Sequence, residues 1–377
     1  MEQKTDVVIV GGGVIGCAIA YYLRKAGRDV IVLEQGEIGA QASSAAAGLL
    51  APLGPLSGPG PFADLLLASF ALFPSLVPEL EKASGVHLEY EQTGALRTVR
   101  NPKRVAHLKK RMEAWQPLGL KMQWLTGNEA RQREPLLGPD IQAAIYAPEE
   151  SQIKAPQVVK AFSQAARNLG AKIYDHKKVI GIQQEKSRVT GVQIYQNETI
   201  ACNHLVLATG AWSAEYEEWF NISLPVKPLR GQLICFRQPP QPLHHIIFGE
   251  AIYLAPKGDN ILVGATKEDA GFDVQVTEEG TSWLRKSAIK LVPELEQNSI
   301  EASWAGLRPK TPDTRPILGK IAKWENVILA TGHNSVGIIL SAITGKTITE
   351  LISMQSTPEI IQPFSNERFV ELNLSKI

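Results

Sequence analysis

The sequence has few cysteines and almost no net charge. Three cysteines occur in 377 residues, and neither a C-x-x-C pair nor a metal-ligand spacing relates them. We therefore expect no metal site and no disulfide framework, and we predict a cytoplasmic location. The 39 lysines and arginines are balanced by 38 aspartates and glutamates, for a net charge of +1. Neither nucleic acid nor an anionic membrane surface is expected as a partner.

Long apolar segments are also missing. The most apolar run, Phe62 to Pro78, is short for a membrane span and is interrupted by Asp64 and two prolines. We interpret it as a buried helix and expect no transmembrane segment. No basic segment with a following apolar core precedes the first predicted strand at residue 6, so no secretory signal is expected. The length favours two joined domains.

A strand, a glycine turn, a helix and a second strand are predicted within the first 34 residues. Residues 6–10 read as a short buried strand, and an apolar helix follows the turn. Between them lie three glycines in G-x-G-x-x-G spacing, Gly11, Gly13 and Gly16. The second strand, residues 28–33, ends on Glu34. This context makes the motif a dinucleotide-binding fingerprint rather than a chance glycine turn.

Each residue type in the fingerprint has a physical role. Gly11 permits the tight turn, Gly13 lets the backbone approach a pyrophosphate, and Gly16 lets helix and strand pack closely. The helix N-terminus offers free N–H groups to the phosphates. Glu34, 18 residues after Gly16, is positioned to accept hydrogen bonds from ribose hydroxyls. An acid there disfavours a 2′-phosphate and hence NADP, and leaves NAD and FAD open.

Two further patterns point to a large flat ligand. Small residues dominate Ala42 to Leu50, where they allow a close approach to a ligand. The alternative is the start of an alanine-rich helix capped by Ser43 or Ser44, and both interpretations can hold. The tripeptide A-T-G ends two hydrophobic strands, at residues 203–210 and 328–332. Two such ends favour neighbouring strands of one parallel sheet that meet a ligand at their carboxyl ends.

The fold class predicted is α/β (α+β), with a Rossmann-like nucleotide-binding domain on a parallel sheet and a substrate domain on a largely antiparallel sheet. Strands at residues 231–236, 251–255 and 260–265 are assigned to the second sheet. The first domain is expected to be discontinuous, with the second inserted in it. We place residues 1–85, 150–215 and 300–377 in the first domain, and 86–149 and 216–299 in the second.

Five motifs now resemble one group of flavoproteins. They are V-V-I-V-G-G-G-V-I-G at 7–16, S-S-A-A-A-G-L-L at 43–50, V-G-A-T at 263–266, W-A-G-L-R-P at 304–309 and T-G-H-x-x-x-G-I at 331–338. Together they cover most of the chain, and their order is similar to that of the glycine oxidase and D-amino acid oxidase group, within the sarcosine-oxidase-like set. Among these the bacterial glycine oxidases of the ThiO type, which serve thiazole synthesis for thiamine, are the most similar.

The resemblance implies FAD as the cofactor. The bond is expected to be non-covalent, because no cysteine falls in a flavin-facing motif outside the phosphate helix. The residues expected to contact FAD, from the fingerprint and the resemblance together, are Gly11, Gly13, Val14, Ile15, Gly16, Glu34, Gln35, Ala42, Ser43, Ala47, Gly48, Leu49, Val179, Gly210, His333, Asn334, Ser335, Val336, Gly337, Ile338 and Ile339. His333 is interpreted as a backbone-bonded residue at the flavin edge rather than a catalytic base. The helix predicted from Ile338 would stabilise negative charge on the reduced flavin with its N-terminus.

The resemblance also implies an activity: oxidation of glycine, sarcosine or a small D-amino acid to an oxo acid, with oxygen reduced to hydrogen peroxide. Arg308 is the residue expected to bind the substrate carboxylate through its planar fork, and the hydroxyl of Tyr253 is expected to assist it. An ion-paired arginine and a core tyrosine are the alternatives. Ser335 stands where glycine oxidases usually carry an arginine, so a bulkier or secondary amine has room there.

Lys267 is the candidate catalytic residue, and two rival functions stay open. Lys267 directly follows V-G-A-T, where a lysine near flavin N5 assists oxygen reduction in sarcosine oxidases; a solvated lysine at a strand end is an equal alternative. The rivals are an FAD-dependent D-amino acid dehydrogenase with a different electron acceptor and a non-catalytic FAD-binding subunit. A nicotinamide enzyme is disfavoured, because the small-residue run and the G-H motif have no role there. A homo-oligomer is expected.

Overall fold

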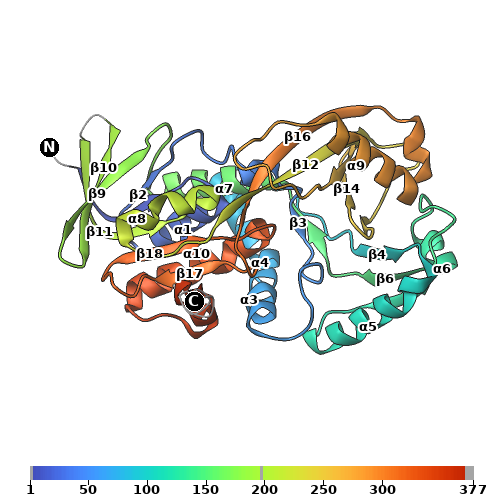
Figure 1. Cartoon of the computed structure of the whole chain (residues 1–377), viewed down its shortest axis with the longest axis horizontal. Helices are drawn as coiled ribbons and strands as arrows, with labels where there is room; N and C mark the ends of the chain where they lie inside the picture. The colour runs from blue at the N-terminus through green and yellow to red at the C-terminus, as the bar shows by residue number, and fades with distance from the viewer. Residues whose placement is uncertain (1–2, 196–197, 370–377) are drawn as a thin grey trace, which may run out of the picture.

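Two eight-stranded sheets organise the chain, and they lie at opposite ends of its long axis (Figure 1). The computed structural model describes residues 3–195 and 198–369. Residues 1–2, 196–197 and 370–377, which include both ends of the predicted first domain, lie outside the described residues. The expected fold class is confirmed, since one sheet is rich in parallel pairs and the other is largely antiparallel.

The first sheet has a parallel centre. In spatial order its strands are β17 (Ile317–Lys320), β18 (Val327–Thr331), β11 (Glu198–Leu207), β1 (Gln3–Val10), β2 (Val30–Leu33) and β8 (Lys172–Tyr174), and the strands β9 (Val179–Glu185) and β10 (Arg188–Ile194) extend from β11. All of these except β17, β9 and β10 run parallel. Val7, Val8 and Ile9 are fully buried, because elements cover both faces of a parallel sheet.

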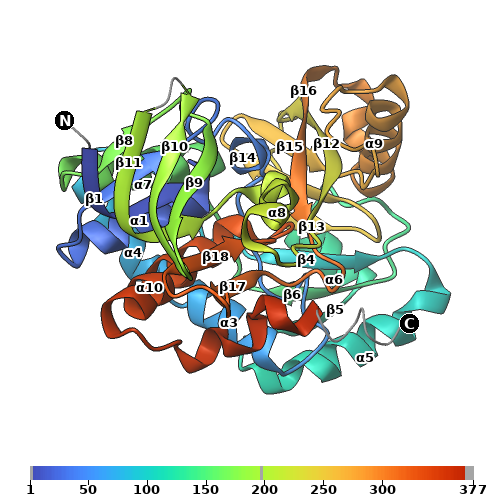
Figure 2. The same cartoon turned by 60° about the vertical axis from the view of Figure 1, so that its left-hand side comes forward.

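Helices cover one face of this sheet (Figure 2). They are α1 (Val14–Lys25), α3 (Pro61–Phe70), α4 (Phe73–Ser84), α7 (Ala155–Asn168) and α10 (Gly337–Met354). By length and composition α10 qualifies as a candidate membrane span, but 67% of its 18-residue window is buried. It packs against α1 and α3, so it is a core helix. The opposite face is covered by β9, β10 and the short helices η4 (Gly210–Tyr216) and α8 (Glu217–Phe220).

Two predicted elements have different boundaries. The run Phe62 to Pro78 is not one helix but belongs to two, α3 and α4, bent by 47°. Pro74 lies in the first turn of α4, where its missing N–H is tolerated, so it starts a new helix rather than continuing the old one. The segments 198–201 and 203–210, predicted as separate strands, join in β11, because this strand pairs with β10 in its first half and with β1 along its length.

The two A-T-G strand ends lie side by side. Strands β11 and β18 pair in parallel, with Leu205 opposite Val327 and Leu207 opposite Leu329. The prediction that both belong to one parallel sheet is confirmed. The hydroxyl of Ser213 in η4 lies 2.5 Å from that of Thr331, and Ser213 also donates to the carbonyl of Gly210 at 2.7 Å. The two strand ends are therefore joined directly.

The second sheet is antiparallel at every pair except β4 with β13. In spatial order its strands are β16 (Ile300–Lys310), β12 (Lys227–Arg237), β15 (Asn260–Gly264), β14 (Tyr253–Lys257), β13 (Ile246–Phe248), β4 (Ala95–Val99), β6 (Ala143–Ala147) and β5 (Gln123–Thr126). Helices α6 (Gly127–Arg133) and α9 (Glu278–Leu291) pack on its outer face, and α5 (Val105–Trp115) lies at its β6 end.

Two segments lie in the other half from the one predicted. Residues 300–310, expected in the first domain, form β16 and pair with β12 along almost its whole length. Conversely, Tyr216, Phe220 and Leu224, expected in the substrate domain, are buried in the core of the first sheet. Both differences have the same cause. The position of an edge strand or of a short amphipathic helix depends on the element against which it is buried, and local sequence patterns do not identify that element.

The small-residue run joins the two sheets. It forms α2 (Ala42–Ala45) and β3 (Leu49–Leu50), the latter paired with β7 (Ser151–Gln152). Trp304 of β16 donates from its indole nitrogen to the carbonyl of Ala45 at 3.0 Å, and a Cβ added at Gly306 would lie 2.5 Å from the Cβ of Ala45. Side chains larger than alanine would separate the sheets here.

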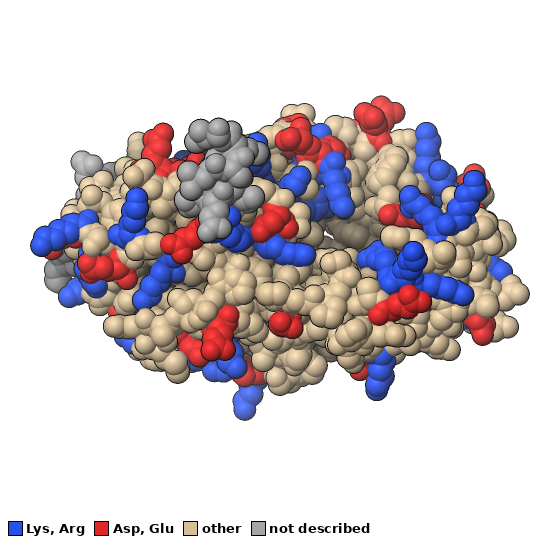
Figure 3. All heavy atoms as spheres, turned by 60° about the horizontal axis from the view of Figure 1, so that its bottom comes forward, with Lys and Arg blue, Asp and Glu red and all other residues tan. Residues whose placement is uncertain are grey.

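Charged side chains of both signs are spread over the surface. On the face in Figure 3, lysines and arginines are mixed with aspartates and glutamates, and the surface is hollowed near its middle. This mixture of both signs agrees with the balanced composition.

Candidate functional site

One elongated cavity runs between the two sheets. The carboxyl ends of β1, β2, β11 and β18 form one wall and strands β12, β14 and β16 another. Of the predicted residues, those that line it are Gly11, Gly13, Val14, Ile15, Glu34, Gln35, Ala42, Ser43, Ala47, Gly48, Leu49, Val179, Gly210, Tyr253, Arg308, His333, Asn334, Ser335, Gly337, Ile338 and Ile339. Segments from almost the full length of the chain therefore meet at one site.

Three predicted residues do not line the cavity. Gly16 is buried, and an added Cβ would overlap the carbonyl of Gly11, so it serves the close packing of α1 on the turn. Val336 is the N-cap residue of α10. Lys267 is exposed and does not line the cavity, which favours the solvated lysine at a strand end over a buried ammonium near the flavin.

Several lining residues were not predicted. Aromatic and aliphatic side chains dominate this set, which includes Lys177, Thr209, Trp212, Tyr216, Leu233 and Leu307. For Trp212 a signal existed, because it directly follows the A-T-G end of β11. For Leu233 no local signal existed, because its orientation depends on the pairing of β12 with β16, in which it lies opposite Trp304.

The N-terminus of α1 forms one part of the cavity wall. Cys17 donates the first bond of the helix, to Gly13, which leaves the preceding amides without helical acceptors. The hydroxyl of Ser43 accepts from the amide of Val14 at 3.0 Å. The predicted cap of α2 by Ser43 or Ser44 is therefore wrong, since α2 has no side-chain cap and Ser43 instead caps a helix 29 residues earlier in the chain. Free amides and a hydroxyl suit phosphate oxygens.

Glu34 is held rigidly at the end of β2. One of its carboxylate oxygens accepts from the amide of Gly12 at 2.7 Å, and the other accepts from the amide of Gly36 at 2.9 Å. Lys177 lies beside it, and its amide donates to the carbonyl of Glu34 at 2.7 Å. Each carboxylate oxygen retains a further lone pair, so the side chain can accept hydrogen bonds from the hydroxyls of a ribose.

The N-terminus of α10 forms the opposite part of the wall. The helix begins at Gly337, and its first amides are directed toward the loop that carries Asn334. The side-chain oxygen of Asn334 is buried and has no hydrogen-bond partner among residues 3–195 and 198–369. A buried acceptor without a partner is costly, and a bound ligand with an N–H group would satisfy it. The cavity thus fits a ligand with a diphosphate, a ribose and a polar ring.

His333 is buried at this end of the cavity. Its Nε2 lies 3.1 Å from the hydroxyl of Thr344 in α10, so the predicted backbone bond is replaced by a side-chain bond. Burial lowers the pKa of His333 from 6.5 to about 3. The ring is therefore neutral at physiological pH and does not add a positive charge to the site.

Replacing His333 with glutamine is expected to make the protein less sensitive to acid. Because the folded-state pKa lies below 6.5, the unfolded chain binds the proton first as the pH falls. The contribution of the neutral ring to the free energy of unfolding is fully present above about pH 6.5 and is lost progressively as the pH falls toward 3. Between pH 7 and pH 5, urea unfolding should show that the parent protein loses about 2 kcal/mol more than H333Q; equal losses would contradict this account.

The side chains of Arg308 and Tyr253 each lie across a glycine of the neighbouring strand. Arg308 of β16 passes over Gly231 of β12 and donates to the carbonyl of Thr266 at 3.0 Å. Tyr253 of β14 lies in the same way over Gly264 of β15. A Cβ added at Gly231 would overlap the guanidinium, and one added at Gly264 would overlap the phenol oxygen. Two glycines thus allow both polar groups to lie flat on the sheet.

The electrostatics of this end suit a single anion. Arg308 has no ion pair in the part of the chain that the structure describes, and one of its five N–H donors is used by Thr266. Burial lowers the pKa of Arg308, and Tyr253 and Glu268 act in the opposite direction. Burial raises the pKa of Tyr253 to about 12, so its hydroxyl stays protonated and can donate. A guanidinium without an ion pair beside a protonated hydroxyl has the donors that a carboxylate needs.

Comparisons with known proteins agree with this geometry. The model of the family described as FAD dependent oxidoreductase (DAO) matches residues 6–351. The chain is 35% identical to a glycine oxidase of Geobacillus kaustophilus over 98% of both chains, and the crystal structure of glycine oxidase from that organism superimposes with a TM-score of 0.92 over 96% of this chain and 98% of that one, at 34% identity.

Two further relatives differ in what their names state. The chain is 36% identical to a bifunctional ThiO/ThiG protein of Synechocystis, matching 98% of this chain but 55% of that protein. It is 31% identical to the hydrogen cyanide synthase subunit HcnC of Pseudomonas aeruginosa, over 98% of this chain and 97% of the relative.

Proposed function

The chain belongs to the DAO family of FAD dependent oxidoreductases, within its glycine oxidase/ThiO group, and from this membership we propose that it is an oxidase of glycine or of a similarly small amine with a carboxylate. As a member of the family it binds FAD. We assign the diphosphate to Ser43 and the N-terminus of α1, the ribose to Glu34, and the flavin ring to the Asn334 loop and α10. The observation that carries the substrate proposal is the free guanidinium of Arg308 beside Tyr253 in the cavity.

Arg308 and Tyr253 orient the substrate by its carboxylate. The guanidinium offers two parallel N–H donors, and the protonated hydroxyl of Tyr253 adds a third donor. The chemistry that FAD would supply when bound is acceptance of a hydride from the carbon next to the amine and transfer of the two electrons to an acceptor. Holding the carboxylate fixes this carbon, so orientation lowers the barrier without an acid or base from the protein.

The amine enters in its neutral form. Among the described residues that line the cavity the only carboxylate is that of Glu34, at the ribose end, so an ammonium beside Arg308 would have no counter-ion. Loss of its proton to solvent before binding leaves the nitrogen lone pair free to form the C=N bond as hydride departs. The imine then hydrolyses to the oxo acid and ammonia or an amine.

Peroxide formation is the direct test of the proposal. FAD-loaded protein is assayed for hydrogen peroxide with glycine, sarcosine, N-ethylglycine, D-alanine and D-proline. Peroxide with glycine supports a glycine oxidase; peroxide only with the larger or secondary amines supports the same chemistry with a site widened at Ser335, which lines the cavity and is exposed. Bleaching of the flavin by an amine without peroxide would identify a dehydrogenase. No bleaching by any of them would overturn the proposal in favour of an FAD-binding subunit.

The remaining predictions concern the electron acceptor, the cellular location, the oligomeric state and the pathway. Because Lys267 is exposed, it no longer supports oxygen as the electron acceptor. The peroxide assay alone distinguishes an oxidase from a dehydrogenase. Cytoplasmic location and homo-oligomer formation remain predictions. A role in thiazole synthesis for thiamine is proposed from the resemblance to ThiO proteins.

Replacing Gly231 with alanine is expected to weaken substrate binding and leave FAD binding intact. The added Cβ overlaps the guanidinium of Arg308, which must leave its place on the sheet and lose alignment with the carboxylate. We expect KM for the amine to rise about tenfold, since alignment of a charge-assisted bond contributes about 1.5 kcal/mol. A matched control is Gly54→Ala, whose Cβ would have only an ordinary contact at 3.6 Å. An unchanged KM in G231A would contradict the flat placement.

A further inference from the structure

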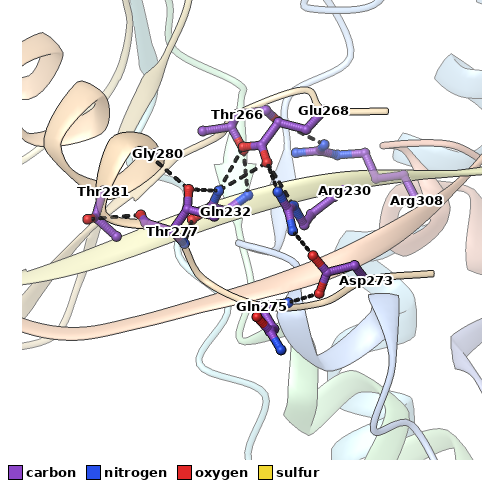
Figure 4. Close-up of polar contacts among 10 residues, drawn as sticks. All are labelled: Arg230, Gln232, Thr266, Glu268, Asp273, Gln275, Thr277, Gly280, Thr281 and Arg308. Atoms are coloured by element: carbon purple, nitrogen blue, oxygen red, sulfur yellow. Dashed lines mark hydrogen bonds and ion pairs between the residues drawn. The ribbon is translucent and has the colours of Figure 1, made fainter. Parts of the chain in front are cut away.

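A buried arginine holds a carboxylate on the outer side of β12. Arg230, 7% exposed, donates from Nε to Glu268 at 2.7 Å and from Nη1 to Asp273 at 2.6 Å (Figure 4). Gln232 donates from its amide nitrogen to the two oxygens of Glu268, at 2.8 and 3.1 Å. The carboxylate of Glu268 is thus held by two side chains of one strand, and its charge is paired with that of Arg230.

Strand β12 separates this network from the cavity. Gly231 faces the guanidinium of Arg308, whereas Gln232 faces Gly280 of α9 on the outer side of the sheet. Alternate residues of a strand point to opposite faces, so Arg230 and Gln232 lie on the outer face. The side chain of Glu268 is bonded to both and is therefore held on the same outer face.

Glu268 is nevertheless close to Arg308. It follows by two residues Thr266, whose carbonyl accepts from Arg308 at 3.0 Å. Its backbone pairs with that of Arg230, by bonds of 2.9 and 3.0 Å, beyond the end of β15 at Gly264. The charge of Glu268 reaches Arg308, because it partly offsets the lowering of the Arg308 pKa by burial. Figure 4 shows the Arg308 guanidinium beside Thr266 and Glu268, with Arg230 below them.

We propose that Arg230 is a positioning residue that keeps Glu268 away from Arg308, so that the guanidinium of Arg308 stays free for the carboxylate of the substrate. The inference rests on the proposed function, because it assumes that Arg308 receives that carboxylate. Among residues 3–195 and 198–369, Arg230 is the only cation that forms an ion pair with Glu268. Without Arg230, Glu268 would compete with the substrate for Arg308, on which its charge already acts, and as part of the same chain it would do so at a high effective concentration.

The test is the affinity of FAD-loaded protein for acetate, a carboxylate without an amine, followed by the change in flavin absorbance or by calorimetry. Arg230→Gln is expected to weaken acetate binding about tenfold or more and to raise KM for the amine with little change in kcat. The double variant R230Q/E268Q removes the competing charge as well and is expected to restore acetate affinity to within about threefold of the parent.

Asp273→Asn is the matched control. It breaks the second ion pair of the same arginine and leaves Glu268 bound, so acetate affinity should not change. If R230Q does not retain FAD, Arg230→Lys is compared instead, because one ammonium cannot hold Glu268 and Asp273 in two directions as the planar fork does. It should weaken acetate binding about threefold, and adding E268Q should relieve this loss.

The outcomes separate the inference from the function. Parent affinity in R230Q, or a loss that E268Q does not restore, would overturn the inference, because a merely structural role for Arg230 predicts no rescue. A parent protein that neither binds acetate nor is reduced by any amine would instead overturn the proposed function.

Discussion

Replacing Arg308 with methionine is expected to abolish useful affinity for the amine substrate while FAD stays bound. The guanidinium is the only cation described at the substrate end of the cavity, and one of its donors is used by Thr266. Two charge-assisted bonds to a carboxylate are together worth about 3–4 kcal/mol. We therefore expect kcat/KM to fall about a hundred- to a thousandfold, measured by peroxide formation or anaerobic flavin reduction.

Arg308→Lys is the informative companion variant. It keeps the positive charge but loses the planar fork, so it should recover only part of the lost affinity. The flavin spectrum and FAD content of both variants should match those of the parent, because the residues assigned to FAD lie on other elements. Full activity in R308M would show that the carboxylate is bound elsewhere. Loss of FAD from R308M would show that the arginine is structural.

Replacing Gly11 with alanine is expected to give a destabilised protein that does not retain FAD. Gly11 has a φ of +107°, and an added Cβ would overlap the backbone carbonyl of Ala208 at the end of β11. The backbones of Gly11 and Ala208 are both held in place, since the amide of Gly11 donates to the carbonyl of Leu33 at 2.8 Å and the amide of Ala208 donates to the carbonyl of Val10 at 2.8 Å. A positive φ costs an alanine about 1–2 kcal/mol, and forced overlap adds about 1–3 kcal/mol.

Thermal unfolding and the visible spectrum of the purified variant measure both effects. Gly54→Ala again serves as the control, because the same change there has room. The turn at Gly11 is where β1, β2 and β11 come together, so a shift moves the N-terminus of α1 away from the place assigned to the diphosphate. A yellow G11A protein with the parent's melting temperature would mean that the turn tolerates a side chain.

Some elements could be predicted because the residues that specify them are close together in the sequence. The glycine turn between β1 and α1, the acid at Glu34 and the two A-T-G strand ends depend on residues that are neighbours in sequence, or on a periodicity within one element. The cavity lining follows from the same segments, since parallel strands present their carboxyl ends at one edge. Of the predicted site residues absent from the lining, Gly16 and Val336 each adjoin a lining residue, whereas Lys267 follows a motif that lies outside the lining.

Other features depend on partners distant in the sequence. Ser43 belongs to the cap of α1 and not of α2, because the fold brings its hydroxyl to Val14. The glycines Gly231 and Gly264 matter because Arg308 and Tyr253 lie across them from the next strands. No single-sequence pattern distinguishes such glycines from the others, since the space they provide is used by a side chain of another strand.

Sequence patterns predict the dinucleotide fingerprint and an α/β fold with two sheets, and the family resemblance points to Arg308 as the residue that binds a carboxylate. Whether that arginine is free of an ion pair depends on contacts that form only in the folded chain. Arg308 and Arg230 lie on paired strands and both have glutamate within reach, yet Arg230 holds Glu268 on the outer face and Arg308 faces the cavity with one bond to a carbonyl. The physical reason is that burial and pairing set the charge available at a site, and both arise from contacts between residues far apart in the chain.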